Sequence, residues 1–416
     1  MEIGKLFEMA LSIQDPWYVK ELTFNDENRQ LNIHIDFKRG SKFYYQDDDN
    51  KQEGYFPVHD TVEKSWRHLN FFEHECYLYC RTPRIKLPDG SVRLVSPPWS
   101  GVNSGFTLLF EALILELCRH MPVATVGKLI GESDDKLWRI LGKYIQEVKG
   151  QEDYSEVSKV GVDETSRAKG HDYISLFVDL EKKRTLFIAD GKDSQTVAAF
   201  ARDFESHKGK PEQISDVSCD MSPAFIKGVR DCFPVAEITF DRFHILKIIN
   251  EAVDKVRREE VKLHSILTGT RYIFLKNNDN LTNKQKEQLS EIKLSKLNLK
   301  TVRALHIREA FQSIYQSATI HEFEILLKKW FWWATHSRLE PLREAAHTIK
   351  RHWQGVINWK RSRISNGLLE GLNSLIQAAK SKARGYSSSK NFKIIAYLIT
   401  GKLDFGKINP ACGMFN

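Results

Sequence analysis

The order of strands and helices between residues 159 and 240 constrains the fold of this chain more than any other feature. Apolar residues recur there first at the short spacing of strands and then at the wider spacing of amphipathic helices. The expected elements are, in chain order, strands over 159–163, 173–179 and 185–189, a helix over 194–206, a strand over 214–219, a helix over 223–232 and a strand over 236–240. The first three strands are short enough to form a meander.

This order is the one expected of a ribonuclease H-like α/β fold, in which the first and fourth strands are parallel neighbours. Asp163 ends the expected first strand, and Asp220 follows the expected fourth one. Ligand sites gather at the carboxyl ends of strands in open α/β sheets, so these two aspartates should meet. An isolated Asp at a strand end is more often a turn residue. Glu164 and Asp179 are rival acids, but Glu164 should point to the opposite face if the strand continues.

A third carboxylate stands out because of its neighbours. Glu370 is the only acid between Gly355 and Lys393, on an expected helix after Ser362. A carboxylate kept inside a strongly basic stretch indicates a metal ligand on a surface that binds a polyanion. The surrounding cations are Lys360, Arg361, Arg363, Lys380, Lys382, Arg384, Lys390 and Lys393.

Three clustered carboxylates would repel one another unless cations joined them. Mg²⁺ or Mn²⁺ suits such a site, because hard divalent ions prefer carboxylate oxygens. Two ions can act together on a phosphodiester, and the basic residues near Glu370 would hold the phosphate backbone. We expect Arg363, Lys380, Lys382 and Arg384 to contact DNA. Asn373, one turn after Glu370, either orients that carboxylate or lies on the surface.

A second basic surface is expected before the α/β domain. The pattern predicts a helix over 107–120, a second from Pro122 to near Gly131, and a third opened by Ser133. Short helices joined by a tight turn have the shape of a helix-turn-helix, although a plain three-helix packing module is the alternative. The third helix would present Lys136, Arg139 and Lys143 to DNA.

Composition narrows the class of protein. The formal charge of +8 mildly favours an anionic partner such as nucleic acid. The six cysteines are scattered without a disulfide pattern, which fits a reducing cytoplasm. We see no signal peptide at the N-terminus and no apolar run long enough for a bilayer. A cytoplasmic protein without a membrane partner is therefore expected.

The remaining segments complete a five-domain prediction. Residues 1–100 pattern as short strands and turns, and residues 245–358 pattern as helices that contain four of the nine tryptophans, with Trp359 directly after them. Core packing is the usual role of such a cluster, with base stacking by an exposed Trp as the alternative. The five expected divisions are a β-rich N-terminal module over 1–100, a helix-turn-helix over 101–150, the first part of an α/β catalytic domain over 156–244, an all-helical insertion over 245–358, and the C-terminal part of the catalytic domain over 359–406.

Short motifs occur along nearly the whole chain. They are Val58-His59-Asp60, Trp66-Arg67-His68-Leu69, Pro97-Pro98-Trp99, Gly161-Val162-Asp163-Glu164, Cys219-Asp220-Met221-Ser222, Asp241-Arg242-Phe243-His244, Ile364-Ser365-Asn366-Gly367, Glu370-Gly371-Leu372-Asn373 and the stretch 380–386. Together they resemble bacterial insertion-sequence transposases of the DDE type, specifically the ISL-three family. The resemblance implies that Asp163, Asp220 and Glu370 are the catalytic, metal-binding triad. It also implies that Asp241 and His244 lie near the active site, although Asp241 in an N-cap position is an equal and compatible interpretation.

One departure from the family concerns zinc. The resemblance implies an N-terminal zinc module, but no C-x-x-C pair is present, so this module is expected to be degenerate and zinc-ribbon-like. Cys76 and Cys80 with His59, His68 or His74 have an unusual spacing for zinc, which makes zinc an unlikely cofactor.

The resemblance implies a transposase that binds the terminal inverted repeats of its element, cleaves DNA with two divalent ions, and joins the ends to target DNA. It implies at least a dimer on double-stranded DNA. Two alternatives are a catalytically inactive or domesticated DNA-binding protein and a ribonuclease H-like structure-selective nuclease.

Overall fold

The computed structural model describes residues 3–47, 52–101, 104–168, 170, 172–295, 297–364 and 367–415. The chain is a mixed α/β protein that divides into two compact units. The first unit contains residues 1–150, 379–384 and 403–416, and the second contains residues 151–378 and 385–402. The five domains expected from the sequence are a finer division, which stays a prediction.

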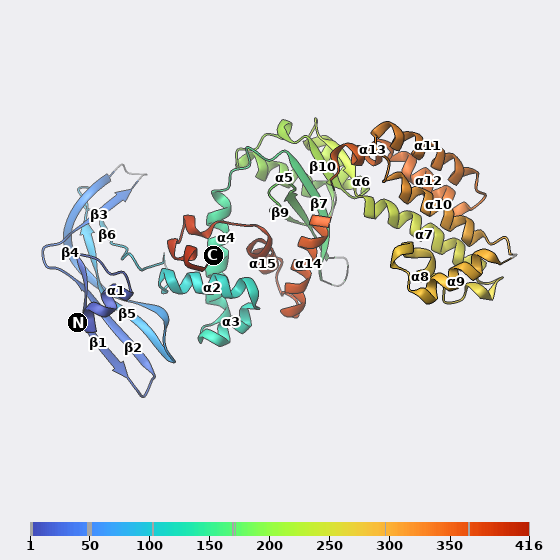
Figure 1. The fold of residues 1–416 in the computed structure, drawn as a ribbon. Coiled ribbons are helices and arrows are strands. Elements are labelled where there is room, and N and C mark those ends of the chain that lie inside the picture. The colour runs from blue at the N-terminus through green and yellow to red at the C-terminus, as the bar shows by residue number, and fades with distance from the viewer. Residues whose placement is uncertain are drawn as a thin grey trace. The chain divides into compact units, whose positions relative to one another are not determined.

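The N-terminal part of the first unit is a sheet that is built from long strands (Figure 1). The strand order is β1-β2-β5-β4-β3, with β6 on β5, and β2 and β5 run parallel. Trp17, Trp66 and Trp99 form the centre of its apolar core. The strands are β1 (Trp17–Asn25), β2 (Gln30–Phe37), β3 (Lys42–Asp47), β4 (Gln52–Phe71), β5 (His74–Lys86) and β6 (Val92–Leu94).

The expectation of short strands holds for β1, β2, β3 and β6 but was wrong for β4 and β5. β4 spans 20 residues and β5 spans 13, and the two pair over most of their length. The sequence pattern also missed α1 (Ile3–Ala10), a helix without fully buried residues.

Three helices follow in the same unit. They are α2 (Leu108–His120), α3 (Val123–Ile130) and α4 (Asp134–Gly150). Thr107 caps α2 by accepting a hydrogen bond from the backbone N–H of Phe110, and Gly131 ends α3 in the left-handed conformation. The bounds agree with those expected from the sequence to within a residue or two.

The second unit is built on a five-stranded sheet. The strand order is β11-β10-β7-β8-β9; β10 is parallel to both β7 and β11, whereas β7, β8 and β9 form an antiparallel meander. The elements are β7 (Lys159–Ala168), β8 (Asp172–Asp179), β9 (Arg184–Asp190), α5 (Ser194–Ser206), β10 (Asp216–Cys219), α6 (Pro223–Cys232) and β11 (Glu237–Phe240).

Helices cover both faces of this sheet. Val160 and Val162 of β7 belong to the core that contains Phe200 of α5, whereas Gly161 between them contacts α14 (Gly367–Lys382). An added Cβ at Gly161 would lie 2.9 Å from Leu369 Cδ1, so the glycine permits the close approach of α14. On the same side as α14, α15 (Ser389–Thr400) contacts β9, where the backbone N–H of Ile188 donates to Tyr397 Oη over 2.9 Å.

A block of helices separates β11 from α14 in the sequence. Its last helix, α13, packs directly on β11, because Gly355 leaves room for the ring of Phe240, and Asn358 donates to the Ile238 carbonyl. Trp330 is buried in this block, whereas Trp332 and Trp333 are exposed. The helices are α7 (Arg242–Glu260), α8 (Arg271–Leu275), α9 (Asn283–Leu294), α10 (Lys300–Ile314), α11 (Ile320–His336), α12 (Glu340–Arg351) and α13 (Trp353–Ser362).

Among the residues that the structure describes, no helix has both the length and the apolar character needed to cross a membrane.

Candidate active site

The parallel pairing of β10 with β7 brings Asp220 near Asp163. The paired residues run from Asp216↔Lys159 to Ser218↔Gly161, and Asp220 directly follows β10. The same offset, continued past the last pair, would set Asp220 opposite Asp163, and the charge of Asp220 contributes to the raised pKa of Asp163. Neighbouring strands lie about 4.8 Å apart, and residues opposite each other in a parallel pair point to the same face. The two aspartates are far apart in the sequence because one lies on β7 and the other directly follows β10, and the pairing of those strands brings them close in space.

One part of the sequence interpretation was wrong. Asp163 does not end its strand, because β7 continues to Ala168 in antiparallel pairing with β8. The parallel partner β10 ends at Cys219, so Asp163 lies on β7 at the point where only one neighbour remains. The sequence interpretation expected Asp163 to lie at the end of β7. Instead, Asp163 lies beside the end of the neighbouring strand β10.

Asp163 is a half-buried carboxylate with two donors. Its Oδ1 accepts the backbone N–H of Glu164 over 2.8 Å, and its Oδ2 accepts Nδ2 of Asn373 over 2.7 Å. Burial raises the pKa of Asp163 to about 6, and the charges of Asp220 and Asp241 act in the same direction. The Glu164 N–H and His244 oppose that increase. A cation at this position would offset the free-energy cost of burying the Asp163 carboxylate and would reduce the repulsion between the neighbouring negative charges.

Asp241 and His244 adjoin these two aspartates at the start of α7. His244 Nδ1 lies 3.1 Å from Asp241 Oδ2, although the two groups are off the line of a regular hydrogen bond. Contact with Asp241 raises the pKa of His244, and the charges of Asp163 and Asp220 add to the increase. Asp241 occupies the N-cap position of α7, but its side chain makes no capping hydrogen bond. Asp241 thus lies at a cap position without making the capping hydrogen bond, and its carboxylate lies near Asp163. Its place in an active site stays a prediction.

Helix α14 runs along β7 with matching spacing. Leu369, Asn373 and Gln377 are separated by about 6 Å of helix rise each, close to the advance of every second residue on β7. Leu369 meets Gly161, Asn373 meets Asp163, and Gln377 donates to Thr165 Oγ1 over 2.8 Å.

Glu370 occupies the first turn of α14, one turn before Asn373, and its side chain is exposed. No contact between Glu370 and either aspartate occurs among the described residues, and no group of three His, Cys, Asp or Glu in that set is close enough to share a metal ion. The structure thus brings Asp163, Asp220, Asp241 and His244 together and leaves Glu370 on the adjoining helix. Asn373 binds Asp163 rather than Glu370, which differs from the role considered for it from the sequence.

The rival acids have other partners. Glu164 points to the opposite face of β7 from Asp163, where Lys192 lies 3.5 Å away. Asp179 accepts the backbone N–H groups of Glu181 and Lys182 and so holds the turn after β8. Neither acid belongs to the cluster.

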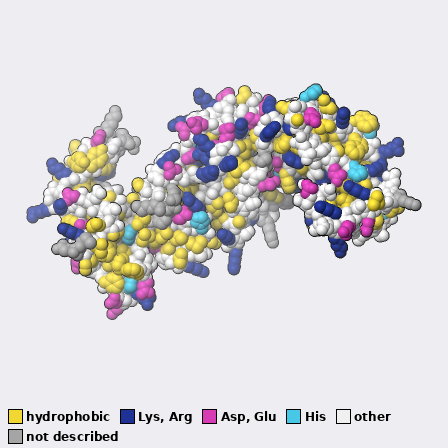
Figure 2. All heavy atoms as spheres, in the orientation of Figure 1, with side chains coloured by type: hydrophobic (Ala, Val, Ile, Leu, Met, Phe, Trp, Pro, Cys, Tyr) yellow, Lys and Arg dark blue, Asp and Glu magenta, His cyan; other side chains and the backbone are white. Residues whose placement is uncertain are grey.

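The residues predicted to bind DNA occupy two regions. Lys136, Arg139 and Lys143 share one face of α4; Lys136 forms an ion pair with Glu132, and Arg139 is exposed. Arg363 is exposed at the C-terminal cap of α13. Lys380 and Lys382 lie in the last turn of α14, and Arg384 follows it. Figure 2 shows Lys and Arg side chains spread over the visible face rather than gathered in one patch.

Cys76 and Cys80 lie in the apolar core of the N-terminal sheet. Burial raises the pKa of Cys76 to about 11 and that of Cys80 to about 12, so both thiols stay protonated near neutral pH. These surroundings differ from those of a zinc ligand, and a metal-free module stays the prediction.

Sequence reasoning missed the anchoring role of Gln377 and the contact from Asn373 to Asp163. A signal exists, because Leu369, Asn373 and Gln377 recur at every fourth position and define one helix face. What that face would contact is determined by the tertiary structure.

Comparisons with known proteins identify the family of this chain. Residues 160–396 match a family model described as "Transposase", and residues 95–145 match the "Helix-turn-helix domain of transposase family ISL3", the ISL-three family. A transposase for insertion sequence element IS1001 from Bordetella parapertussis is 25% identical over 344 residues, which cover 80% of this chain and 84% of the relative. A transposase for insertion sequence element IS1557 from Mycobacterium tuberculosis is 25% identical over 368 residues, which cover 80% and 81% of the two chains.

Proposed function

Because this chain belongs to transposase family ISL3 and carries the helix-turn-helix domain of that family, we propose that it cuts and joins DNA at the ends of its own insertion sequence. Hydrolysis of a phosphodiester at the element boundary would release a 3′-hydroxyl. That hydroxyl would then attack a phosphodiester of target DNA, with a target 3′-hydroxyl as the leaving group.

The sheet topology supports a ribonuclease H-like catalytic domain. The antiparallel meander β7-β8-β9, extended by the parallel strands β10 and β11, follows the order expected from the sequence. The helical block enters after β11 and the fold resumes with α14. We retain the interpretation of the N-terminal sheet as a degenerate zinc-ribbon-like module only as a proposal, since its long strands lend it no support.

The observation that supports the proposal is the parallel pairing of β10 with β7, which brings the end of β10 beside the part of β7 that carries Asp163. Asn373 of α14 donates to Asp163 there. We assign Asp163 and Asp220 as shared ligands of two Mg²⁺ or Mn²⁺ ions, with Glu370 completing the site. When bound, such ions would activate the attacking oxygen and stabilise the leaving oxygen of the phosphodiester. Asn373 donates to one oxygen of Asp163, and Glu370 lies one turn earlier on the same helix.

His244 is a proton-holding group beside these carboxylates. Contact with Asp241 raises the pKa of His244, which favours a protonated imidazole before divalent ions neutralise Asp163 and Asp220. A protonated imidazole there would hold negative phosphate oxygens, and Asp241 would keep its ring oriented.

Two groups of basic residues would contact different parts of the DNA. Lys136, Arg139 and Lys143 on α4 would contact the terminal inverted repeat, as expected of the recognition helix of a helix-turn-helix. Arg363, Lys380, Lys382 and Arg384 would hold phosphates of the cleaved strand or of target DNA. We further propose that at least two copies act together in the bacterial cytoplasm, because an element has two ends.

The test is cleavage of a labelled duplex that carries the element end, with Mg²⁺ or Mn²⁺, by the wild type and by Asp163→Ala, Asp220→Ala and Glu370→Ala. Glu164→Ala is the matched control, since this acid adjoins Asp163 but lies on the opposite face with Lys192. We expect cutting at the boundary by the wild type and the control, and loss of cutting in the three variants.

Each other outcome is informative. Specific binding without cutting by the wild type would favour an inactive or domesticated DNA-binding protein. Cutting of branched DNA regardless of the element end would favour a structure-selective nuclease. Cutting that survives Glu370→Ala would remove Glu370 from the metal site, a result that its exposure makes worth seeking.

A further inference from the structure

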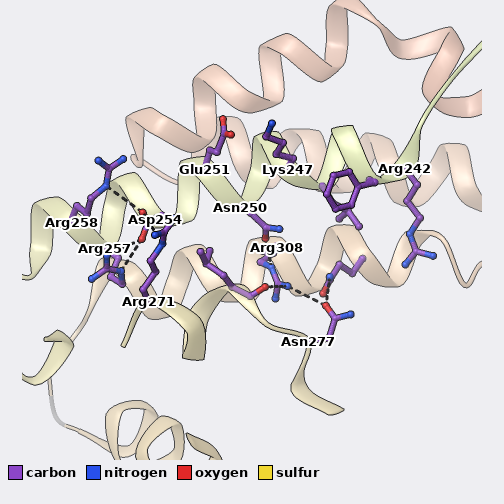
Figure 3. A pocket seen from close by; sticks show the side chains of 14 residues that line it. Arg242, Lys247, Asn250, Glu251, Asp254, Arg257, Arg258, Arg271, Asn277 and Arg308 are labelled. Carbon is purple, nitrogen blue, oxygen red and sulfur yellow. Dashed lines mark hydrogen bonds and ion pairs between the residues drawn. The ribbon is translucent and has the colours of Figure 1, made fainter. Parts of the chain in front are cut away.

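A pocket of about 710 Å³ opens in the helical block, between α7, α8 and α10 (Figure 3). It is separate from the carboxylate cluster, but both begin at the first turn of α7. Arg242 and Phe243 line the pocket, whereas Asp241 and His244 belong to the cluster. The two features therefore share one end of a helix.

The lining of this pocket is strongly basic. Six cations face two carboxylates, Glu251 and Asp254. Arg242 packs its guanidinium over the ring of Tyr315 at 4.6 Å, and neither Arg242 nor Lys247 has an ion pair within the described part of the chain. The cations are Arg242, Lys247, Arg257, Arg258, Arg271 and Arg308.

Asp254 is shared by three arginines. Its Oδ1 lies 2.8 Å from Arg257 Nη2, and its Oδ2 lies 3.3 Å from Arg258 Nε and 3.7 Å from Arg271 Nε. One carboxylate cannot neutralise three guanidinium groups, so this end of the pocket keeps a net positive charge.

Among the six pocket cations, Arg308 has the most unusual surroundings. Only 2% of the residue is exposed, yet its hydrogen bonds go to the neutral oxygens of Asn250, Leu275 and Asn277. Burying a guanidinium without a counter-ion is costly, and desolvation lowers the pKa of Arg308. An anion in the pocket would supply the missing negative charge (Figure 3).

The spread of the cations indicates the size of that anion. Lining residues recur along α7 from Arg242 to Arg258, which corresponds to about 24 Å of helix rise. A single phosphate group cannot contact both ends of such a track. Successive phosphates of a nucleic-acid strand can, because each strand presents one charge per about 3.4 Å of axis.

We propose that this pocket holds backbone phosphates of DNA whose adjoining segment enters the carboxylate cluster. The strand would pass from Asp241 and His244 along α7, with Arg242 nearest the cluster and Arg258 and Arg271 farthest from it. The identity of the ligand as DNA rests on the proposed function, whereas the requirement for an extended anion comes from the pocket itself.

The test is the salt dependence of binding between the full chain and a duplex that carries the element end, measured by fluorescence anisotropy without divalent ions. Lys247→Gln and Arg271→Gln remove exposed pocket cations from α7 and α8, singly and together. Each should reduce the slope of log K against log salt by about 0.9, and the pair by about 1.8.

Matched controls lie in the same helical block. Lys328→Gln on α11 and Arg343→Gln on α12 remove the same charge from ion pairs outside the pocket, with Glu324 and Glu340. Both should leave the slope unchanged. Glu251→Gln should change DNA affinity in the opposite direction. Loss of this pocket carboxylate should strengthen DNA binding several-fold at low salt, and an unfolded variant could not show that gain.

Slopes that match those of the controls, or a Glu251→Gln variant that binds no more tightly, would overturn the proposal. Thermal stabilisation by pyrophosphate that the double variant loses, with an unchanged DNA slope, would also overturn it and indicate a small-anion site. Failure of the proposed function is distinguishable, since the slope needs no cutting: altered slopes without any cleavage by the wild type would leave the pocket assigned and refute the catalysis.

Discussion

Acidification should loosen the contact between the N-terminal sheet and the first helix of the helix-turn-helix through one histidine. His68 Nδ1 on β4 lies 2.8 Å from Thr107 Oγ1, and Thr107 caps α2 by accepting the N–H of Phe110. We infer the neutral tautomer in which Nδ1 accepts the Thr107 hydroxyl hydrogen. A proton on Nδ1 would remove that acceptor beside the buried Arg67.

The loss of stability on acidification follows from the pKa shift of His68. Burial in the first place, and the charge of Arg67 in the second, lower the pKa of His68 from 6.5 to about 4. The unfolded chain therefore takes up the proton first, so the stabilisation is complete above about pH 6.5 and is lost as the pH falls toward 4. The loss amounts to about 2 kcal/mol at about pH 5 and about 3 kcal/mol near pH 4.

The assay compares urea unfolding of the wild type and His68→Gln at about pH 8 and about pH 5. Glutamine cannot take up the proton but keeps a side-chain acceptor near Thr107. The variant should lose about 2 kcal/mol less than the wild type between the two conditions. His120→Gln is the control, because that imidazole is exposed and pairs with Glu116.

Equal losses in the wild type and His68→Gln would refute the reasoning, since the acid sensitivity would then come from other groups. A loss that His120→Gln also removes would point to general charge rather than to the buried contact. Binding to the element end should weaken at about pH 5 in the wild type and less in His68→Gln.

Three further predictions concern packing in the second unit. Gly355→Ala places a Cβ 2.3 Å from the ring of Phe240 and should lower the free energy of unfolding by about 1–3 kcal/mol in urea titrations; an unchanged midpoint would mean that α13 moves freely on β11. Gly371→Ala meets nothing within 4 Å inside α14 and should raise the unfolding free energy by about 0.5–1 kcal/mol, so a decrease would contradict the open space described there. Asn373→Leu removes the donor to Asp163 and should cost about 1.5–3 kcal/mol at neutral pH with a loss of DNA cleavage; a wild-type urea midpoint would show that water replaces the amide.

The α/β part of the chain was largely predictable because its boundaries are marked locally. The helices over 194–206 and 223–232 have the expected bounds, since Asp193 caps α5 and Pro223 opens α6. The strand β7 was predicted too short, because its second half, Glu164 onward, is polar on both faces. That half is held by pairing with β8, which a local pattern does not reveal.

The N-terminal sheet was harder to predict for the same reason. β4 runs through 20 residues that include charged stretches, and its partners β3 and β5 hold different parts of it. Long strands with polar faces carry little alternation, so the sequence pattern breaks them into short pieces.

The candidate site was predictable as a set of residues but not as a set of contacts. The strand order places Asp163 beside Asp220, and this follows from topology alone. The partner of Asn373 depends on how α14 rotates on β7, which is set by Leu369 against Gly161. Glu370 shows most clearly what the sequence could not predict. The helix that carries it was expected, but the exposure of its side chain was not.

The hydrogen bond between Asn373 and Asp163 joins residues 210 positions apart. During synthesis the strand that bears Asp163 emerges long before α14, and the whole helical block must follow first. Closing so long a loop costs entropy that only completed packing offsets, so the site assembles late. A chain that stops before residue 367 would keep both aspartates but lack α14, and it would also lose Asn409, which donates to the Leu108 carbonyl and to Tyr144 Oη in the three-helix segment. Residues 367–416 therefore contribute to both compact units, so truncation should disturb the support of the three-helix segment as well as the candidate site.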